Sequence, residues 1–158
     1  MKKTTHILFT IYLFLIIWII LFKLSISIEQ LPHFRSINLI PFYYPNKTTY
    51  QIKEVMENMI IFIPFGLYLK TLNIHNSRTV FLGFLLSLSL ELSQYIFGIG
   101  ASDITDLITN TVGVIIGVGI YQLIKKLFKD KTNKIIISLA AVTTILIISL
   151  IVCILINN

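Results

Sequence analysis

The stretch ELSQYIFGIGASDITDLITNTVGVIIG, residues 91–117, places carboxylates and amides inside segments that are otherwise apolar enough for a bilayer. In its second half, polar and then small residues recur at steps of three and four: Asp103, Asp106, Asn110, Gly113 and Gly117. Residues at this spacing share one face of a helix. The stretch therefore predicts a helix whose polar and small stripe packs against other helices.

A second polar stripe precedes the first, because Ser87, Glu91 and Gln94 also follow helical spacing. Between the stripes, residues 98–102 predict a tight turn. The two helices would then form a hairpin with their polar groups opposed. An ionisable residue inside a membrane helix is costly and usually marks a functional site.

The composition indicates an integral membrane protein. Of 158 residues, 56% are hydrophobic and 13% are charged, and the mean hydropathy is +0.87. Each crossing needs roughly 20 residues, so the length allows one small bundle. The formal net charge is +6, but the basic residues stand at the ends of apolar runs and form no patch with exposed aromatics. This arrangement argues against a nucleic-acid partner.

Five apolar runs predict an all-α bundle of about five transmembrane helices: residues 7–22, 59–72, 80–97, 104–124 and 135–156. Pro64 lies within the second run and should kink that helix. Residues 23–56 form a long polar segment that also carries prolines and aromatic residues. We expect this segment to lie at the membrane surface or to re-enter it as a cap.

The positive-inside rule orients the bundle in the cell membrane. With the N-terminus in the cytoplasm, the inner segments carry nine basic residues: Lys2, Lys3, Lys70, Arg78, Lys125, Lys126, Lys129, Lys131 and Lys134. The outer segments carry four: Lys23, Arg35, Lys47 and Lys53. This multi-pass orientation predicts an extracellular C-terminus and places the polar stripes in the outer half of the bundle.

Three carboxylates are the candidates for catalysis, namely Glu91, Asp103 and Asp106. A buried Glu91 costs several kcal/mol unless it is paired, protonated or wetted, although a structural hydrogen bond could meet that need. Asp103 could instead cap the following helix, with Asp106 in its first turn at the positive end of the dipole. Gly113 and Gly117 are most simply a close helix contact.

The residue types allow more than one chemistry. Carboxylates with Asn110 as a further oxygen ligand could bind a hard cation, or a buried and a wet carboxyl could divide acid and base work. The spacing of His6, His33 and His75 does not suit a soft metal, so the sequence leaves both metal and cofactor open. Arg35 could pair with an acid or hold an anionic head group, or it could be an interfacial charge.

Four motifs in this order resemble the VanZ-like family of bacterial membrane proteins: RSINLIPF at 35–42, ENMIIFIPFG at 57–66, ELSQ at 91–94 and DITDLITNTVG at 103–113. The resemblance covers nearly the whole chain. It implies a single membrane domain over residues 1–158, with a core at 35–124 and an extra C-terminal helix at 135–156. Many relatives have an arginine just before the aspartate pair, where this chain has Gly100, Ala101 and Ser102.

The resemblance implies a protein that lowers susceptibility to glycopeptide antibiotics, chiefly teicoplanin. We expect a ligand site beneath a roof formed by residues 35–44, made of Arg35, Asn38, Asn58, Glu91, Gln94, Asp103, Asp106 and Asn110. The expected partners are membrane lipids, with a lipid-linked cell-wall precursor or the antibiotic itself as the ligand. The alternative is an intramembrane enzyme, a hydrolase or transferase that modifies such a precursor.

Overall fold

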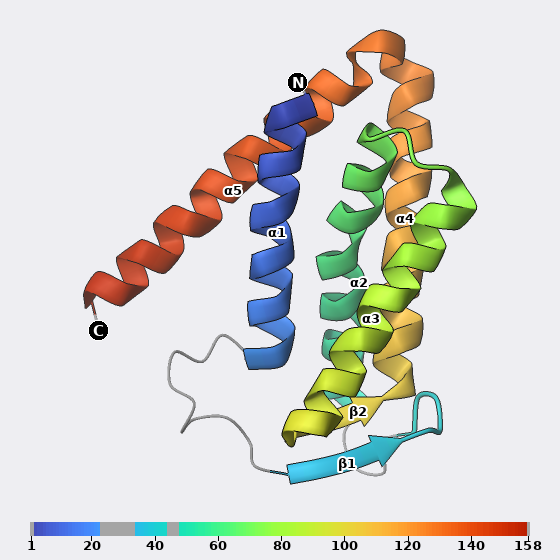
Figure 1. Ribbon diagram of the computed structural model, residues 1–158, viewed down its shortest axis with the longest axis vertical. Coiled ribbons are helices and arrows are strands. Elements are labelled where there is room, and N and C mark those ends of the chain that lie inside the picture. The colour runs from blue at the N-terminus through green and yellow to red at the C-terminus, as the bar shows by residue number, and fades with distance from the viewer. Residues whose placement is uncertain (1, 23–33, 44–47, 158) are drawn as a thin grey trace.

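The computed structural model describes residues 2–22, 34–43 and 48–157, and helices make up most of it (Figure 1). These are α1 (Lys2–Phe22), α2 (Thr48–Thr71), α3 (Asn76–Phe97), α4 (Ile104–Phe128) and α5 (Thr132–Asn157), with the short 3-10 helix η2 (Lys129–Lys131) before α5. Four of the apolar runs of the sequence lie within one of these helices, and the second run, 59–72, extends one residue past the end of α2. The expected all-α class is confirmed for the described residues.

Three helical stretches of the described chain are long and apolar enough to cross a membrane: Lys2–Phe22, Asn76–Phe97 and Ile104–Cys153. The last covers α4, η2 and most of α5. These stretches support a membrane protein. Pro64 lies inside α2, which is assigned as one helix from Thr48 to Thr71.

A two-stranded parallel sheet was not expected from the sequence. Strand β1 (Phe34–Asn38) pairs with β2 (Ile99–Asp103), from Phe34 opposite Ile99 to Asn38 opposite Asp103. The predicted tight turn at 98–102 is therefore wrong. Gly98, with φ of 66°, ends α3, and the chain then continues as a strand. The partner strand lies far away in the sequence, so the local residue pattern carries no sign of the pairing.

Helices α2 and α4 pack with their backbones in direct contact. A Cβ atom added at Gly113 would collide with the carbonyl of Met59, and one added at Gly117 would collide with the carbonyl of Ile63. Gly66 of α2 faces the same contact, since its Cβ would lie 2.5 Å from the Val114 carbonyl oxygen. Small residues allow this close approach, as is usual between membrane helices. The predicted role of Gly113 and Gly117 as a helix contact is confirmed.

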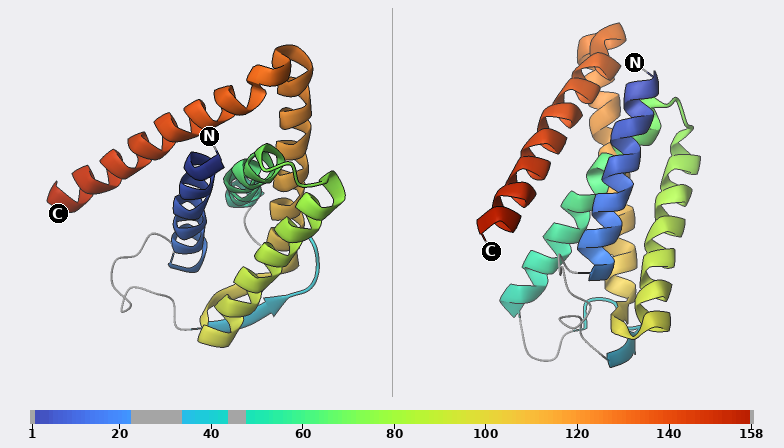
Figure 2. Two further views of the ribbon diagram at one scale, coloured as in Figure 1. Left: turned by 45° about the horizontal axis from the view of Figure 1, so that its top comes forward. Right: turned by 60° about the vertical axis from the view of Figure 1, so that its left-hand side comes forward.

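The apolar core surrounds this pair and draws on α1, α2, α3 and α4. Its buried members are Ile16, Phe62, Phe65, Leu69, Leu90 and Val114. Helix α1 is also attached by a hydrogen bond, because the Tyr12 hydroxyl donates to the Ile61 carbonyl over 2.8 Å. Helix α5 leaves the bundle at an angle, and its second half lies away from the other helices (Figure 2).

The two ends of the bundle differ in charge. One end, here named the sheet end, holds β1, β2, the end of α3 and the starts of α2 and α4 (Figure 1). The opposite end, the basic end, holds the start of α1, the α2–α3 connection and the turn from α4 through η2 into α5. The basic residues predicted to lie inside occur on these basic-end segments. Of those predicted outside, Lys23 and Lys47 lie beyond the described residues.

Candidate functional site

Glu91 lies at the centre of the sheet end, on the last turns of α3. Its side chain is buried, with 4% of the residue exposed. Its Oε2 accepts a hydrogen bond of 2.8 Å from the backbone N–H of Asp103. The carboxylate therefore meets the junction between β2 and α4, and the buried charge has a donor. The predicted opposition of the two polar stripes is correct at this point.

The side chain of Asp103 joins α4 to β1. Its Oδ1 accepts from the Thr105 N–H over 2.7 Å, which is the N-cap geometry of α4. Its Oδ2 accepts from Asn38 Nδ2 over 3.0 Å. Asp103 thus caps the helix, as the sequence allowed, and also holds the end of the paired strand. Glu91, Asp103 and Asn38 form one continuous chain of polar contacts.

Asn38 also organises the turn that follows β1. Its Oδ1 accepts from the Ile40 N–H over 3.1 Å, and its Nδ2 donates to the Tyr43 carbonyl over 3.3 Å. Phe42 has a φ of 56°, which is unusual for a bulky residue, and its N–H donates to the buried Thr105 Oγ1 over 3.0 Å. Residues 35–43, here named the roof, are therefore fastened to the start of α4. Tyr44, the predicted last residue of the roof, lies outside the described residues.

Asp106 connects α4 to α2. Its Oδ1 accepts a hydrogen bond of 2.7 Å from Asn58 Nδ2. Asp106 stands in the first turn of α4, where the positive end of the helix dipole favours a carboxylate. Asn58 and Asp106 were both predicted as site residues, and the structure brings them into direct contact.

Asn110 and Gln94 are buried amides, and each keeps one side-chain oxygen without a hydrogen-bond partner. Asn110 Nδ2 donates to Ser87 Oγ over 3.0 Å, so Asn110 of α4 contacts α3 one turn deeper than Glu91. Gln94 Nε2 donates to the Ile20 carbonyl of α1 over 3.0 Å and therefore does not face α4. The acceptor oxygens Asn110 Oδ1 and Gln94 Oε1 are buried and have no hydrogen-bond partner. Such groups are rare in proteins and call for an explanation.

Arg35 lies at the edge of the site. Its side chain is exposed, and Nη2 donates to the Ile96 carbonyl over 3.1 Å. A Cβ atom at Gly98 would lie 3.2 Å from Arg35 Nε, so the guanidinium covers the end of α3. A cation there faces the negative end of the helix dipole. The sequence had left open an acidic partner, an anionic head group or an interfacial charge for Arg35, and the hydrogen bond observed goes to a carbonyl.

The site is rich in oxygen acceptors and carries negative charge. The carboxyl groups of Asp103 and Glu54 lie near that of Glu91. Among the described residues, no group of three or more His, Cys, Asp or Glu side chains is placed to hold a metal ion. Carboxylate and amide oxygens of this kind can bind hydroxyl, amide or cationic groups of a ligand.

The roof presents apolar side chains on its outer surface. Its large apolar residues that are more than half exposed are Ile37, Leu39, Ile40, Phe42 and Tyr43, and Phe34 just before the roof is also more than half exposed. Aromatic and apolar side chains at the end of a membrane bundle suit the interface between lipid tails and head groups. The roof thus places an exposed apolar surface next to the polar chain from Asn38 to Glu91.

Thr105 is an important site residue that sequence reasoning missed. It is fully buried, and it supplies the acceptor for the strained Phe42, a residue 63 positions earlier. A threonine in the first turn of a helix gives no local signal for such a contact. The composition of residues 23–56 and the resemblance of the residues 35–42 motif to a family pattern pointed to a cap, but neither pointed to Thr105.

Comparisons with known proteins agree with this geometry. The family model described as VanZ/LLP1 matches residues 9–125, which include every predicted site residue. Protein VanZ of Enterococcus faecium is 44% identical over 131 residues, which cover 78% of this chain and 77% of that protein. No solved structure matches the chain. The chain therefore belongs to the VanZ/LLP1 family.

Proposed function

We propose that this protein lowers bacterial susceptibility to glycopeptide antibiotics, chiefly teicoplanin. In this proposal its sheet end binds a cell-envelope lipid or a lipid-linked cell-wall precursor. Membership of the VanZ/LLP1 family supports the resistance role. The observation that carries the binding role is the polar chain Glu91–Asp103–Asn38, which runs from the buried Glu91 carboxyl to the half-buried Asn38 of the exposed apolar roof.

The proposed topology has five membrane-crossing helices, with α2 kinked at Pro64, the N-terminus in the cytoplasm and the C-terminus outside. The chain forms one domain over residues 1–158, with a core at 35–124 and an additional helix at 135–156. The separation of charge supports this arrangement, because basic residues crowd the basic end and the carboxylates Glu91, Asp103 and Asp106 lie at the sheet end. In this orientation the sheet end faces the lipid-linked precursors on which teicoplanin acts.

The ligand head group would enter between the roof and the starts of α2 and α4. Asn110 Oδ1 needs a donor, which a hydroxyl or amide group of a precursor can supply. Arg35 uses Nη2 for the Ile96 carbonyl and has further guanidinium N–H groups that suit a phosphate. The roof side chains would remain in contact with the surrounding lipid.

An intramembrane hydrolase or transferase is the second candidate. The observation that favours it is the direct contact of two acidic residues, because buried Glu91 accepts a hydrogen bond from the backbone of Asp103. Carboxyls in unlike environments can divide acid and base roles. An enzyme predicts a precursor of changed mass on expression, whereas a binding protein leaves the precursor mass unchanged. Mass spectrometry of lipid-linked precursors separates the two functions.

The test of the proposed function is the exchange Glu91→Gln in a teicoplanin-sensitive host. Glutamine keeps a carbonyl acceptor for the Asp103 N–H and removes the charge, so the fold should persist. The matched control is Glu57→Gln, which makes the same change at an exposed carboxylate on α2. At equal membrane abundance, we expect Glu91→Gln to lose most of the protection and Glu57→Gln to retain it.

Asp106→Asn is the second variant, because it weakens the contact with Asn58 without changing shape. Susceptibility to vancomycin, measured in parallel, shows whether the effect is specific to teicoplanin. Full protection by both Glu91→Gln and Asp106→Asn would disprove a role of the site in resistance.

A further inference from the structure

A cavity at the basic end is separate from the site described above. It lies between the start of α1, the α2–α3 connection and the start of α5, and its volume is about 460 Å³. Its polar lining comes from three separate segments: Lys2, Thr5, His6, Thr71, Asn73 and Asn133. A cavity lined by so many polar groups holds water or a polar ligand.

The amide of Asn133 has a defined orientation in this cavity. The hydroxyl of Tyr121, a buried residue, donates to Asn133 Oδ1 over 3.0 Å. The Nδ2 group therefore points the other way, and its acceptor is the Thr71 carbonyl at 3.5 Å, the outer limit of a hydrogen bond. The Thr71 hydroxyl is engaged with the Tyr68 carbonyl over 2.7 Å. The wall thus offers an amide donor that is poorly satisfied by the protein itself.

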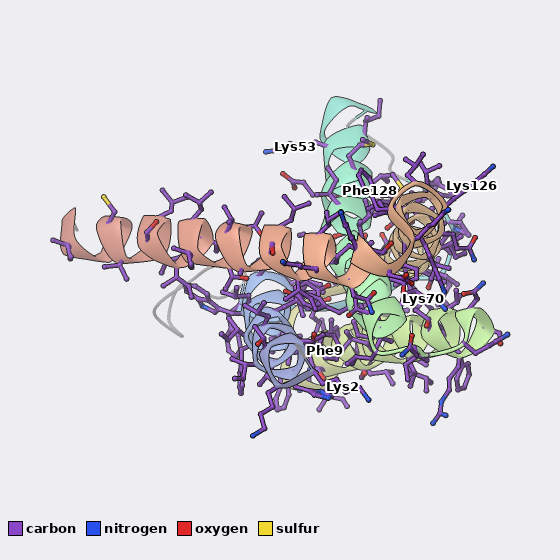
Figure 3. The ribbon with its side chains drawn as sticks, turned by 90° about the horizontal axis from the view of Figure 1, so that it is seen from above. Lys2, Phe9, Lys53, Lys70, Lys126 and Phe128 are labelled. Carbon is purple, nitrogen blue, oxygen red and sulfur yellow. The ribbon has the colours of Figure 1, made fainter. Side chains whose placement is uncertain are left out.

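One lysine lines the same cavity, and further lysines lie at this end of the bundle. The Lys2 side chain lines it, and Figure 3, viewed from this end, shows Lys2, Lys70 and Lys126 near the ends of α1, α2 and α4. Asp130 of η2 is the acidic residue of these basic-end segments within the described chain, and it does not line the cavity. A concave site with one sign of charge concentrates ions of the opposite sign.

The α2–α3 connection is held in place by a lysine, which gives the cavity a fixed wall. Lys70 Nζ donates to the Ile74 carbonyl over 2.7 Å and lies 5.8 Å from the centre of the Tyr121 ring. Backbone bonds close the same turn, from the Asn73 N–H to the Lys70 carbonyl and from the Ile74 N–H to the Leu69 carbonyl. Asn73, the polar cavity residue in this turn, therefore stands on a preformed frame.

We propose that this basic-end pocket binds a phosphate group. Lys2 supplies the charge, Asn133 supplies the oriented amide donor, and His6 and Asn73 complete the polar wall. An anionic lipid head group and free inorganic phosphate present the same chemistry to these residues. The proposal does not depend on the function of the sheet end, since the two sites lie at opposite ends of the bundle.

The test uses the purified full-length chain and two probes. In the first arm, inorganic phosphate is titrated in an uncharged detergent, with sodium chloride at matched ionic strength, while thermal unfolding is followed. In the second arm, native mass spectrometry counts the lipid retained from phosphatidylcholine nanodiscs with and without phosphatidic acid. Specific binding raises the melting temperature saturably or retains phosphatidic acid in a fixed ratio. Saturation with phosphate identifies a free anion as ligand, and retention of phosphatidic acid alone identifies a lipid head group.

Two pocket variants and two matched controls assign the binding. Lys2→Ala removes the charge, and Asn133→Asp removes the amide donor while keeping an acceptor for Tyr121; each should weaken binding about tenfold or more. Lys126→Ala and Gln122→Glu make the same changes at exposed positions outside the pocket and should alter binding by less than about twofold. The proposal is overturned if neither probe saturates, or if the controls weaken binding as much as the pocket variants.

Discussion

Helices α4 and α5 are nearly equal in length, at 25 and 26 residues. Helix α4 lies at the centre of the bundle, however, whereas α5 lies at its edge (Figure 2). Helix α4 contacts α2 and α3 along much of its length and buries polar and small side chains: Thr105, Thr109, Asn110, Gly113 and Gly117. Helix α5 carries no charged residue after Lys134, and most of its described side chains are exposed. The more apolar helix is therefore the less buried one.

This difference in burial follows from the lipid that surrounds a membrane protein. Lipid tails are as apolar as leucine, so leucine and isoleucine gain little from leaving lipid for another helix. Polar groups gain hydrogen bonds inside the bundle, and glycines gain close backbone contact. In this protein the polar and small residues identify the central helix, and general hydrophobicity does not.

The largest expected effect comes from adding bulk to the centre of α4. Gly117→Leu would drive a side chain into the Ile63 carbonyl and separate α2 from α4, at a cost of about 3 kcal/mol or more. The measurement is the melting temperature of the full-length chain in detergent, with its yield in membranes. The matched control is Gly119→Leu, because a Cβ at Gly119 meets no atom within 4 Å. Equal stability of the two variants would contradict the central position of α4.

The next effect concerns the buried polar pair between α3 and α4. Ser87→Ala leaves the buried Asn110 Nδ2 without its acceptor and should cost about 2 kcal/mol. The double variant Ser87→Ala with Asn110→Leu removes both partners, and also the unpaired Oδ1, so it should recover most of that loss.

A thermal double-mutant cycle measures this coupling. Teicoplanin protection should stay low in the double variant even as stability returns, because the acceptor proposed for the ligand is missing. Full protection together with restored stability would assign Asn110 a purely structural role.

A smaller, local effect is expected at the roof. Thr105→Val removes the acceptor for the Phe42 N–H and should cost about 1 kcal/mol, since the strained turn loses one of its attachments. Hydrogen exchange followed by mass spectrometry should speed up at residues 39–43. The control is Thr111→Val, whose hydroxyl donates only to the Leu107 carbonyl of its own helix. Unchanged exchange at the roof in Thr105→Val would refute the attachment.

The smallest effect is expected on the outer part of α5. Leu150 is 61% exposed and should contact lipid, so Leu150→Ala should change stability by less than about 0.5 kcal/mol. Val114→Ala on α4 is the comparison, because Val114 is fully buried against the core. Melting temperatures of the two variants in the same detergent give the contrast. A large loss for Leu150→Ala would mean that α5 packs more tightly in the protein than the structure indicates.

Helical periodicity predicted a substantial part of the fold and of the site. Steps of three and four placed Glu91 and Asp103 opposite each other, and the structure joins them through the Asp103 N–H. The same steps marked Gly113 and Gly117, which form the α2–α4 contact. These features depend on residues close together in the sequence, and local patterns record such features well.

The contacts that the sequence did not predict join distant segments. Strand β1 pairs with β2, which follows two intervening helices. The Gln94 side chain was predicted to face α4, but it donates a hydrogen bond to the Ile20 carbonyl of α1. The hydrogen bond from the Phe42 N–H to the Thr105 hydroxyl likewise joins residues that are 63 positions apart. In each case the partner is set by how whole helices pack, and no spacing within either segment encodes that arrangement.

The β1–β2 pairing also has a consequence for biosynthesis. Asn38 and Asp103 are 65 positions apart, and the chain is made from its N-terminus, so β1 leaves the ribosome well before its partner exists. Until α2 and α3 are inserted, the backbone groups of β1 must hydrogen-bond to water at the membrane surface. The roof can therefore close only after β2 has been delivered, which makes it one of the last parts of the fold to assemble. A ribosome stalled shortly after residue 97 would hold a chain with its first three helices and an unfastened roof.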